Sequence, residues 1–361
     1  MRIEQLTFTR FIAATAIVIY HFGMGSPLFN NQYFSYIFSK ADAGVSYFFV
    51  LSGFVMIIAY IKKKNISFVD FLRRRLARIY PVYVLALFLV VFIKSSDNVR
   101  ITDLLLQIGI IQSWVPGRAL VLNYTGWSLS VEMFFYVLFP WLMAFFYKKY
   151  SVFTSIFWVV IFWVFSQMVY FLVLEEHFNL PFYNWKDLKY LPVMHLNEFL
   201  MGNVAGLWFV KNFKKFNTLY TFKKYIPLCL CLATFALLFL LKNLSGSIHH
   251  NGLLVIIFVP IILLLSISSH SLSNIFSKKP FVLLGEISFG IYILQVPVWI
   301  LFSDYRMNKY FGLDKYDDFT MSFLIRFLIL LIVSAISYLY FEKPIRNYIN
   351  NYGKKKVINA S

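Results

Sequence analysis

Apolar residues gather into long uninterrupted runs along this chain, and short polar segments separate the runs. Ten runs reach the length of about 17–25 residues that a helix needs to cross a bilayer. They lie at 7–24, 44–61, 80–96, 128–147, 151–174, 190–210, 225–241, 252–268, 281–302 and 319–341. The pattern predicts an all-α, polytopic membrane protein with about ten transmembrane helices in one bundle. The segment 100–115 is apolar but short, which is typical of an interfacial or re-entrant segment.

Lysine and arginine are unevenly divided between alternate loops, and cytoplasmic loops carry the excess in membrane proteins. With the N-terminus inside, the inner segments hold 22 basic residues and the outer loops hold 10. Both termini are therefore predicted to be cytoplasmic, with a short basic tail at 347–361.

Composition supports the membrane assignment. Hydrophobic residues make up 60% of the 361 residues and charged residues 14%, whereas a soluble domain has about 25% charged residues. The net charge of +18 is explained by the basic inner loops facing a lipid bilayer, so no nucleic-acid partner is predicted. Cys229 and Cys231 point to different sides of a helix, so neither a disulfide nor a metal site is expected from them.

The first run places Arg10 and His21 eleven residues apart on one helix. At 100° and 1.5 Å per residue, the two side chains share a face and lie about 16 Å apart along the axis. An ionisable residue inside a span is by default a candidate functional residue. The structural alternative is that Arg10 snorkels to the interface while His21 is a satisfied polar residue.

The loop 62–79 is the most basic part of the chain. Ser67 and Asp70 resemble a capping box that starts a short helix, and Pro81 is expected to open the third span. Arg75 and Arg78 are neighbours on that helix. They could anchor the topology against anionic lipid, or they could clamp a phosphate with their planar guanidinium groups.

Two further spans carry carboxylates. Glu132 lies about one turn beyond Ser128, where the helix dipole favours a negative charge, but it could also meet an imidazole from another helix. His195 and Glu198 are three residues apart on one face, and they could form a second polar site or simply pair with each other.

Six motifs occur in an order that resembles a known family. After Arg10 and His21 come GVSYFFVLSGF (44–54), FLRRRLARIYP (71–81), WSLSVEMFFYVLFP (127–140), LGEISFGIYILQVPV (284–298) and FEKPIR (341–346). Together they resemble membrane-bound acyltransferase family 3, whose members O-acylate cell-surface and secreted carbohydrates. The resemblance covers residues 1–346.

The resemblance implies roles for individual residues. His21 would be the catalytic base with Arg10 as its partner, and Arg75 and Arg78 would bind the acyl-CoA donor. The implied co-substrate is acetyl-CoA or a related acyl-CoA, with no permanently bound cofactor. Glu132 would be a further catalytic residue. Candidate substrate-site residues from the matching motifs are Trp127, Ser128, Ser130, Ser52 and Glu342.

The chain departs from the family pattern at two positions. Gln295 stands where a histidine is common, so a histidine role there cannot be transferred. Ser46 replaces a common acidic residue, which leaves Asp42 as the nearby carboxylate. Some members carry a soluble esterase-like domain after the bundle, and this chain is expected to lack one.

These residues suggest a mechanism. Phosphates of CoA held by Arg75, Arg78 and Arg10 at the inner surface would place the thioester near His21, about one extended pantetheine arm away. His21 would take a proton from an acceptor hydroxyl, and Glu132 would orient the imidazole as a triad carboxylate does. Direct attack and a route through an acylated Ser or Tyr both remain open.

The acceptor expected from the family is a glycan or lipid-linked carbohydrate, such as O-antigen or exopolysaccharide, at the bacterial inner membrane. A proton-coupled exporter of a glycan or small molecule is the competing class, because buried His and Glu residues also serve proton relays. A non-catalytic assembly factor would require His21 and Glu132 to be dispensable.

Overall fold

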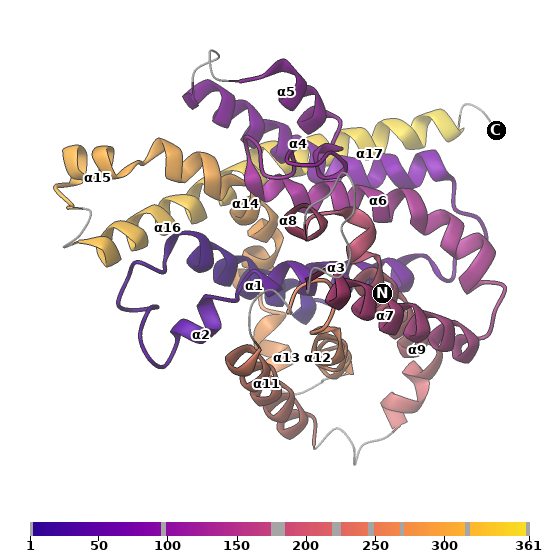
Figure 1. The fold of residues 1–361 in the computed structure, drawn as a ribbon. Coiled ribbons are helices and arrows are strands. Elements are labelled where there is room, and N and C mark those ends of the chain that lie inside the picture. The colour runs from indigo at the N-terminus through magenta and orange to yellow at the C-terminus, as the bar shows by residue number, and fades with distance from the viewer. Residues whose placement is uncertain are drawn as a thin grey trace. The chain divides into compact units, whose positions relative to one another are not determined.

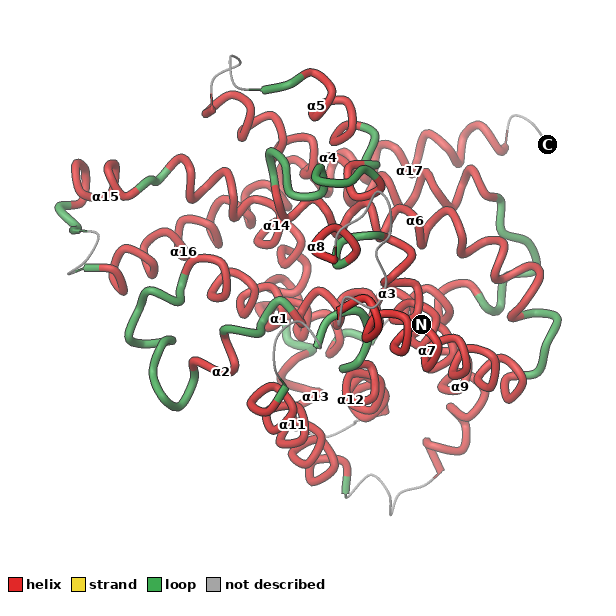
Figure 2. Tube along the Cα trace, in the orientation of Figure 1, coloured by secondary structure: helices red, strands yellow, loops and turns green. Residues whose placement is uncertain are grey.

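The computed structural model describes residues 3–94, 99–174, 185–218, 225–244, 249–267, 271–314 and 318–358. Throughout these ranges the secondary structure is helical, without a strand (Figures 1 and 2). Seven helices among them are long and apolar enough to cross a membrane. The predicted all-α, polytopic class is therefore confirmed.

A helix lies at each of the ten predicted spans. In chain order they are α1 (Gln5–Phe22), α3 (Ala43–Tyr60), α4 (Phe68–Lys94), α6 (Trp127–Leu142), α7 (Val152–Leu174), α9 (Leu196–Thr218), α11 (Ile226–Asn243), α12 (Val255–Ile267), α14 (Lys279–Leu301) and α16 (Phe319–Ile336). Helices α1, α9 and α12 are not among the seven candidates, and α12 is a shorter apolar helix. The count of ten spans and their orientation stay predictions.

Short helices and π-helical segments complete the chain. They are α2 (Ser35–Phe38), α5 (Ile101–Ile108), η2 (Gln112–Trp114), η3 (Tyr124–Gly126), η4 (Met143–Tyr147), α8 (Trp185–Leu188), η5 (Pro192–His195), α13 (Ser271–Phe276), α15 (Asp304–Phe311), η6 (Ser337–Glu342) and α17 (Lys343–Ile358). The predicted basic tail begins on α17, and its last three residues lie outside the described ranges.

The chain divides into two compact units, and the prediction of a single bundle stays a prediction. The first unit comprises Met1–Ile17, Tyr36–Lys64 and Trp141–Glu286, and the second comprises Val18–Ser35, Asn65–Pro140 and Ile287–Ser361. Helix α1 contributes to both units, with Arg10 in the first and His21 in the second.

Glycines set the packing of the first unit. A Cβ at Gly202 of α9 would lie 2.0 Å from the carbonyl oxygen of Val50, and a Cβ at Gly53 of α3 would lie 2.2 Å from that of Phe199. Small residues let helix backbones approach closely inside a membrane, where lipid tails offer no hydrophobic contrast. Helix α9 also packs on α7 and α12, and α12 packs on α3 and α11.

Buried amides organise the second unit around the segment 101–126. Tyr83 of α4 donates to the Gln107 side-chain oxygen at 2.6 Å, and Gln112 donates from Nε2 to the carbonyl of Gly126 at 2.7 Å. Irregular backbone is tolerated at membrane depth where the protein itself satisfies its polar groups. This segment therefore fixes the point at which α6 begins.

Helix α4 corrects one prediction. We expected a short helix that ended before Pro81, but α4 runs without a break from Phe68 to Lys94 with Pro81 inside it. The predicted cap is present, since the Asp70 N–H donates to Ser67 Oγ at 3.4 Å. Buried neighbours on both sides of Pro81, Ile79 and Val82 among them, hold the helix across the missing hydrogen bond. Arg75 and Arg78 consequently belong to the same helix as the third span.

Candidate active site

His21 lies in the last turn of α1 and is half-buried. Its Nδ1 is 2.8 Å from Oε1 of Gln295 on α14, and Gln295 donates from Nε2 to the carbonyl of Tyr292 at 2.6 Å. Because the amide NH₂ is engaged there, the amide oxygen faces the ring and accepts a hydrogen bond from the Nδ1–H of His21. This tautomer puts the imidazole lone pair on Nε2, where a general base needs it.

The ring of Tyr124 packs edge-on against His21, with the ring centroids 4.9 Å apart. Two hydrogen bonds fix Tyr124 from both sides along the chain. Asn123 donates from Nδ2 to the carbonyl of Ile293 at 3.0 Å, and Tyr292 donates to the carbonyl of Thr125 at 3.1 Å. Helix α14 thus positions both His21, through Gln295, and the tyrosine beside it.

Glu132 lies further along α6 than this tyrosine. Its carboxylate accepts a short hydrogen bond from Tyr136, one turn on. The guanidinium carbon of Arg75 lies 5.9 Å from the centre of the Tyr136 ring, and both Arg75 and Arg78 act electrostatically on Tyr136. The structure therefore brings Glu132 together with the two predicted donor-binding arginines through Tyr136.

Polar side chains recur along η3 and the first part of α6. Tyr124, Ser128, Glu132 and Tyr136 recur every four residues, which spans about 18 Å along a helix. His21 lies at the Tyr124 end of this line and Arg75 at the Tyr136 end. We call these four residues the α6 line.

The other candidates in the second unit have local partners. Ser128 donates to the carbonyl of Thr125 at 3.2 Å, Ser130 accepts from the Ser113 N–H at 3.5 Å, and Ser113 Oγ donates to the Trp127 carbonyl at 3.0 Å. Glu342 is buried in η6 and accepts from Ser337 at 3.1 Å. These contacts hold the start of α6 and the π-helical segment η6 in place.

Arg10 and Ser52 belong to the first unit. Arg10 acts electrostatically on Tyr47 of α3, whose hydroxyl shares a hydrogen bond with Thr9. Ser52 donates weakly to the Met56 sulfur at 3.7 Å. Their predicted roles in substrate binding stay predictions.

His195 and Glu198 pair with each other, as one of the two predicted alternatives had it. Nδ1 of His195 is 2.9 Å from Glu198 Oε2, and its Nε2 is 2.9 Å from the carbonyl of Lys189. Asn251 Nδ2 lies 3.5 Å from the same Nε2. Contacts on both ring nitrogens therefore hold His195 in place.

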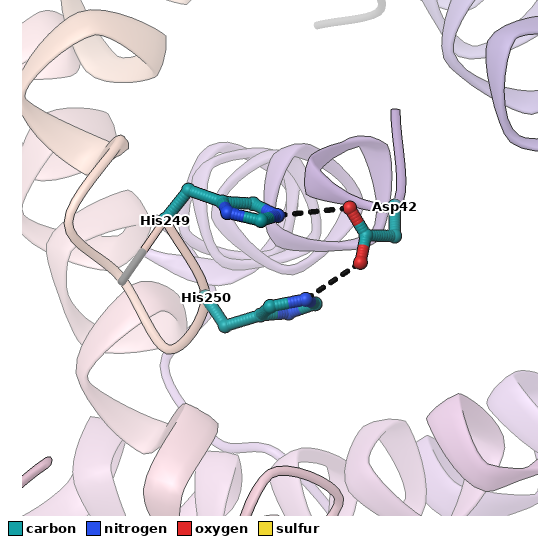
Figure 3. Close-up of side chains that lie close together, drawn as sticks. All are labelled: Asp42, His249 and His250. Carbon is teal, nitrogen blue, oxygen red and sulfur yellow. Dashed lines mark hydrogen bonds and ion pairs between the residues drawn. The ribbon is translucent and has the colours of Figure 1, made fainter. Parts of the chain in front are cut away.

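A second histidine cluster was missed by the sequence analysis. His249 Nε2 lies 2.9 Å from Asp42 Oδ1, and His250 Nε2 lies 2.6 Å from Asp42 Oδ2 (Figure 3). The three ligand-type atoms lie within 4.8 Å of one another, so these residues could hold a metal ion. Lys189 already places an ammonium 3.6 Å from the same carboxylate. We call these four residues the Asp42 cluster.

The protonation of the Asp42 cluster follows from burial and pairing. Burial lowers the pKa of His250 to about 4, so its ring is neutral at pH 7. Burial alone would raise the pKa of Asp42, but hydrogen bonds from His249 and His250 hold it well below its usual range. The adjacent histidines at 249 and 250 were the signal in the sequence for this cluster. Their partner could not be identified, because 207 residues separate His249 from Asp42 in the chain.

Comparison with known proteins finds a family match over nearly the whole chain. The model of a family described as an acyltransferase domain matches residues 3–342. The O-acetyltransferase OatA of Staphylococcus aureus is 25% identical over 377 residues, which cover 93% of this chain and 56% of OatA. The acyltransferase MdmB of Streptomyces mycarofaciens is 31% identical over 156 residues, which cover 39% of each protein.

A third relative is an uncharacterized protein of Haemophilus influenzae, 28% identical over 186 residues that cover 45% of this chain and 73% of the relative. The chain thus spans two fifths to just over half the length of MdmB and OatA. No solved structure matches it.

Proposed function

Because the chain belongs to this acyltransferase family, we propose that it transfers an acyl group, with acetyl expected, from cytoplasmic acyl-CoA to a carbohydrate hydroxyl. The expected acceptor is a glycan or lipid-linked carbohydrate of the bacterial cell envelope. The relatives OatA and MdmB, an O-acetyltransferase and an acyltransferase, support this reaction class. The observation that carries the proposal is the hydrogen bond between His21 Nδ1 and Gln295, because it leaves a basic lone pair on Nε2.

In the proposed reaction, Nε2 of His21 takes the proton from the acceptor hydroxyl while the oxygen attacks the thioester carbonyl. The C–S bond breaks, and the CoA thiolate receives the proton from the imidazolium. Gln295 holds the imidazole in the reactive tautomer. Ser128 and Ser130 are both engaged with backbone groups near the site, which favours direct attack over an acylated serine.

The donor is proposed to lie along the α6 line. Arg75 and Arg78 would bind the CoA phosphates through their guanidinium forks. The distance of about 18 Å from Tyr136 to Tyr124 suits an extended pantetheine arm that ends near His21. Arg10 is proposed as a further ligand of the CoA phosphates. Glu132 is proposed as a catalytic residue that orients the imidazole of His21.

Contacts within each unit support ten spans. Asp42 meets Lys189 and His249, so all three lie on one side of the membrane. Two helices, α9 and α11, separate Lys189 from His249. Since α11 is long and apolar enough to span, this contact supports a span for α9 as well, because one span alone would leave the two residues on opposite sides.

The same parity argument extends to α12 and α1. Phe22 at the end of α1 stacks on Trp299 at the end of α14, with ring centroids 4.3 Å apart. Two residues in contact lie on one side of the membrane, so an even number of spans must separate them. With α9 counted as a span, the number between Phe22 and Trp299 is even only if α12 also spans. Gln5 at the start of α1 donates to the carbonyl of Leu265 near the end of α12 at 3.0 Å, which supports a span for α1 by the same reasoning. Together with the basic inner loops, this supports cytoplasmic termini and an outward-facing His21.

Purified protein in lipid nanodiscs, with labelled acetyl-CoA and envelope glycan fractions, tests the proposal. Wild-type protein should release CoA and transfer label to glycan, and mass spectrometry should show the mass of one added acetyl group. Glycans from cells that lack the gene should lack that mass. Unchanged glycans, together with proton-coupled export of a glycan by the protein reconstituted in sealed lipid vesicles, would favour the exporter instead.

A further inference from the structure

A cavity of about 420 Å³ lies in the second unit immediately beside His21. This volume falls within the range of about 300–1,000 Å³ that is typical of small-molecule sites. Phe22, the neighbour of His21 in the chain, and Tyr124, which packs on the His21 ring, both line it. A molecule in this cavity would therefore lie next to the proposed general base.

One wall of the cavity is aromatic. Phe22 and Trp299 stack with an interplanar angle of 16°, and Trp299 packs in turn on Phe323 at 5.8 Å. A fixed aromatic face offers an apolar surface to the C–H face of a sugar ring, and the polar tip of Trp remains available for hydrogen bonding. This wall suits a carbohydrate.

Three charged side chains, Lys94, Asp304 and Arg326, also line the cavity, which gives two cations against one anion. Arg326 is only 7% exposed, although it belongs to the apolar helix α16. Burying a cation inside a span is costly, and such residues mark binding sites by default.

Arg326 is incompletely paired. It donates from Nη2 to Asp304 Oδ1 at 2.7 Å, while its Nε is buried and has no hydrogen-bond partner within the described residues. A guanidinium carries five N–H donors and can bind a carboxylate or phosphate through two of them. Asp304 is 45% exposed at its side chain, so it could turn aside for a second anion.

We propose that this cavity is the acceptor site and that it selects a negatively charged sugar. The ring would lie against Trp299, the anionic group would bind Arg326, and a hydroxyl would reach Nε2 of His21. This inference rests on the proposed function, because it assigns the acceptor of that reaction. The shared chemistry is a carboxylate or phosphate on a sugar.

Binding without turnover tests the acceptor site apart from catalysis. Saturation-transfer NMR on the full chain in nanodiscs would use methyl glucuronide, methyl glucoside and glucose 1-phosphate as probes. The wild-type protein should bind the two anions about tenfold or more tightly than the neutral glucoside. Comparing glucose 1-phosphate with methyl glucuronide shows whether the site prefers a phosphate or a carboxylate.

Arg326→Gln should remove the preference for anions and leave glucoside binding unchanged, whereas Trp299→Ala should weaken all three probes. Lys309→Gln, at an exposed residue of α15 outside the cavity, is the matched charge control and should change nothing. If Arg326→Gln fails to fold, Asp304→Asn replaces it, and this variant should strengthen anion binding because it removes the competing carboxylate.

Equal binding of the neutral and anionic probes by the wild-type protein would overturn the proposal, as would an equal effect of Arg326→Gln on all probes. His21→Ala should bind the anions normally but not acylate them. Anion binding without any acylation by the wild-type protein would count against the proposed reaction while leaving this binding site standing.

Discussion

The surroundings of His21 and of the Asp42 cluster differ although both contain buried or half-buried imidazoles. Gln295, a neutral amide, holds His21 beside a cavity. His249 and His250 face a carboxylate that Lys189 also neutralises, and both rings are almost fully buried. An amide partner fixes a tautomer of the ring without adding a charge beside it. A carboxylate partner in a buried cluster joins both histidine rings to Asp42 at the start of α3.

The sharpest test of this contrast is to remove each histidine. His21→Ala should lower acyl transfer about 10²–10⁴-fold, the usual loss of a general base, with membrane abundance unchanged. His249→Gln, at equal abundance, should keep most of the activity, because it lies in the first unit and serves structure. Radiolabel transfer to glycan measures both variants. Near-normal transfer by His21→Ala would end its assignment as the base.

Lowering the pH should destabilise the folded protein through the Asp42 cluster. His250 has its pKa lowered to about 4 by burial, against about 6.5 in an unfolded chain. The unfolded state therefore binds the proton more readily, and stability falls as the pH drops from about 6.5 to 4, by up to about 3 kcal/mol. Asp42, whose pKa is depressed, adds a further loss below about pH 4.

Thermal unfolding in nanodiscs at a series of pH values measures this loss. His250→Gln should flatten the dependence between pH 6.5 and 4, while His21→Ala should leave it intact. An identical slope in His250→Gln and wild-type protein would show that other groups titrate there.

Gln295→Leu tests whether the amide controls the tautomer of His21. Losing a hydrogen bond that orients a catalytic group costs about 1–2 kcal/mol, so kcat should fall about tenfold while KM for acetyl-CoA stays the same. Asn123→Leu breaks a different bond to α14 and serves as the comparison. Equal losses in kcat and donor affinity for Gln295→Leu would point to general disruption of the helix instead.

The smallest expected effect concerns the donor end of the α6 line. Arg75→Ala and Arg78→Ala should each raise KM for acetyl-CoA several-fold with little change in kcat, and lysine should rescue only partly because it lacks the planar fork. Glu132→Gln is the contrast on the same line, with lower kcat and unchanged KM. Normal KM with inverted topology in the arginine variants would support their role as a membrane anchor.

The elements of the fold follow from the sequence, because long apolar runs must become helices in a bilayer, where each backbone group needs an internal partner. Pro81 was misread since its effect on a helix depends on neighbours that pack around it, Ile79 and Val82 here, and those contacts are tertiary. The division into two units was also beyond reach, because no polar linker marks it.

The site was only partly predictable. His21, Arg75 and Glu132 stand out as polar groups in or beside apolar runs, and that signal needs no structure. Gln295 is also a polar group in an apolar run, but it was noted only as a departure from the family pattern. Nothing in the sequence shows that its amide contacts His21, which lies 274 residues away in the chain. Asp42 and His249 were likewise linked only by folding.

The glycines at the contact of α3 and α9 have a consequence for how the protein is made. Helix α3 leaves the ribosome well before α9, and α4, α6 and α7 are synthesised in between. During that interval the groove at Gly53 faces lipid or another helix, which is tolerable because α3 already satisfies its own backbone. The first unit can close only when Gly202 arrives. Its assembly is thus timed by the order of translation, and a bulky residue at Gly202 would block it only after α4, α6 and α7 had also been made.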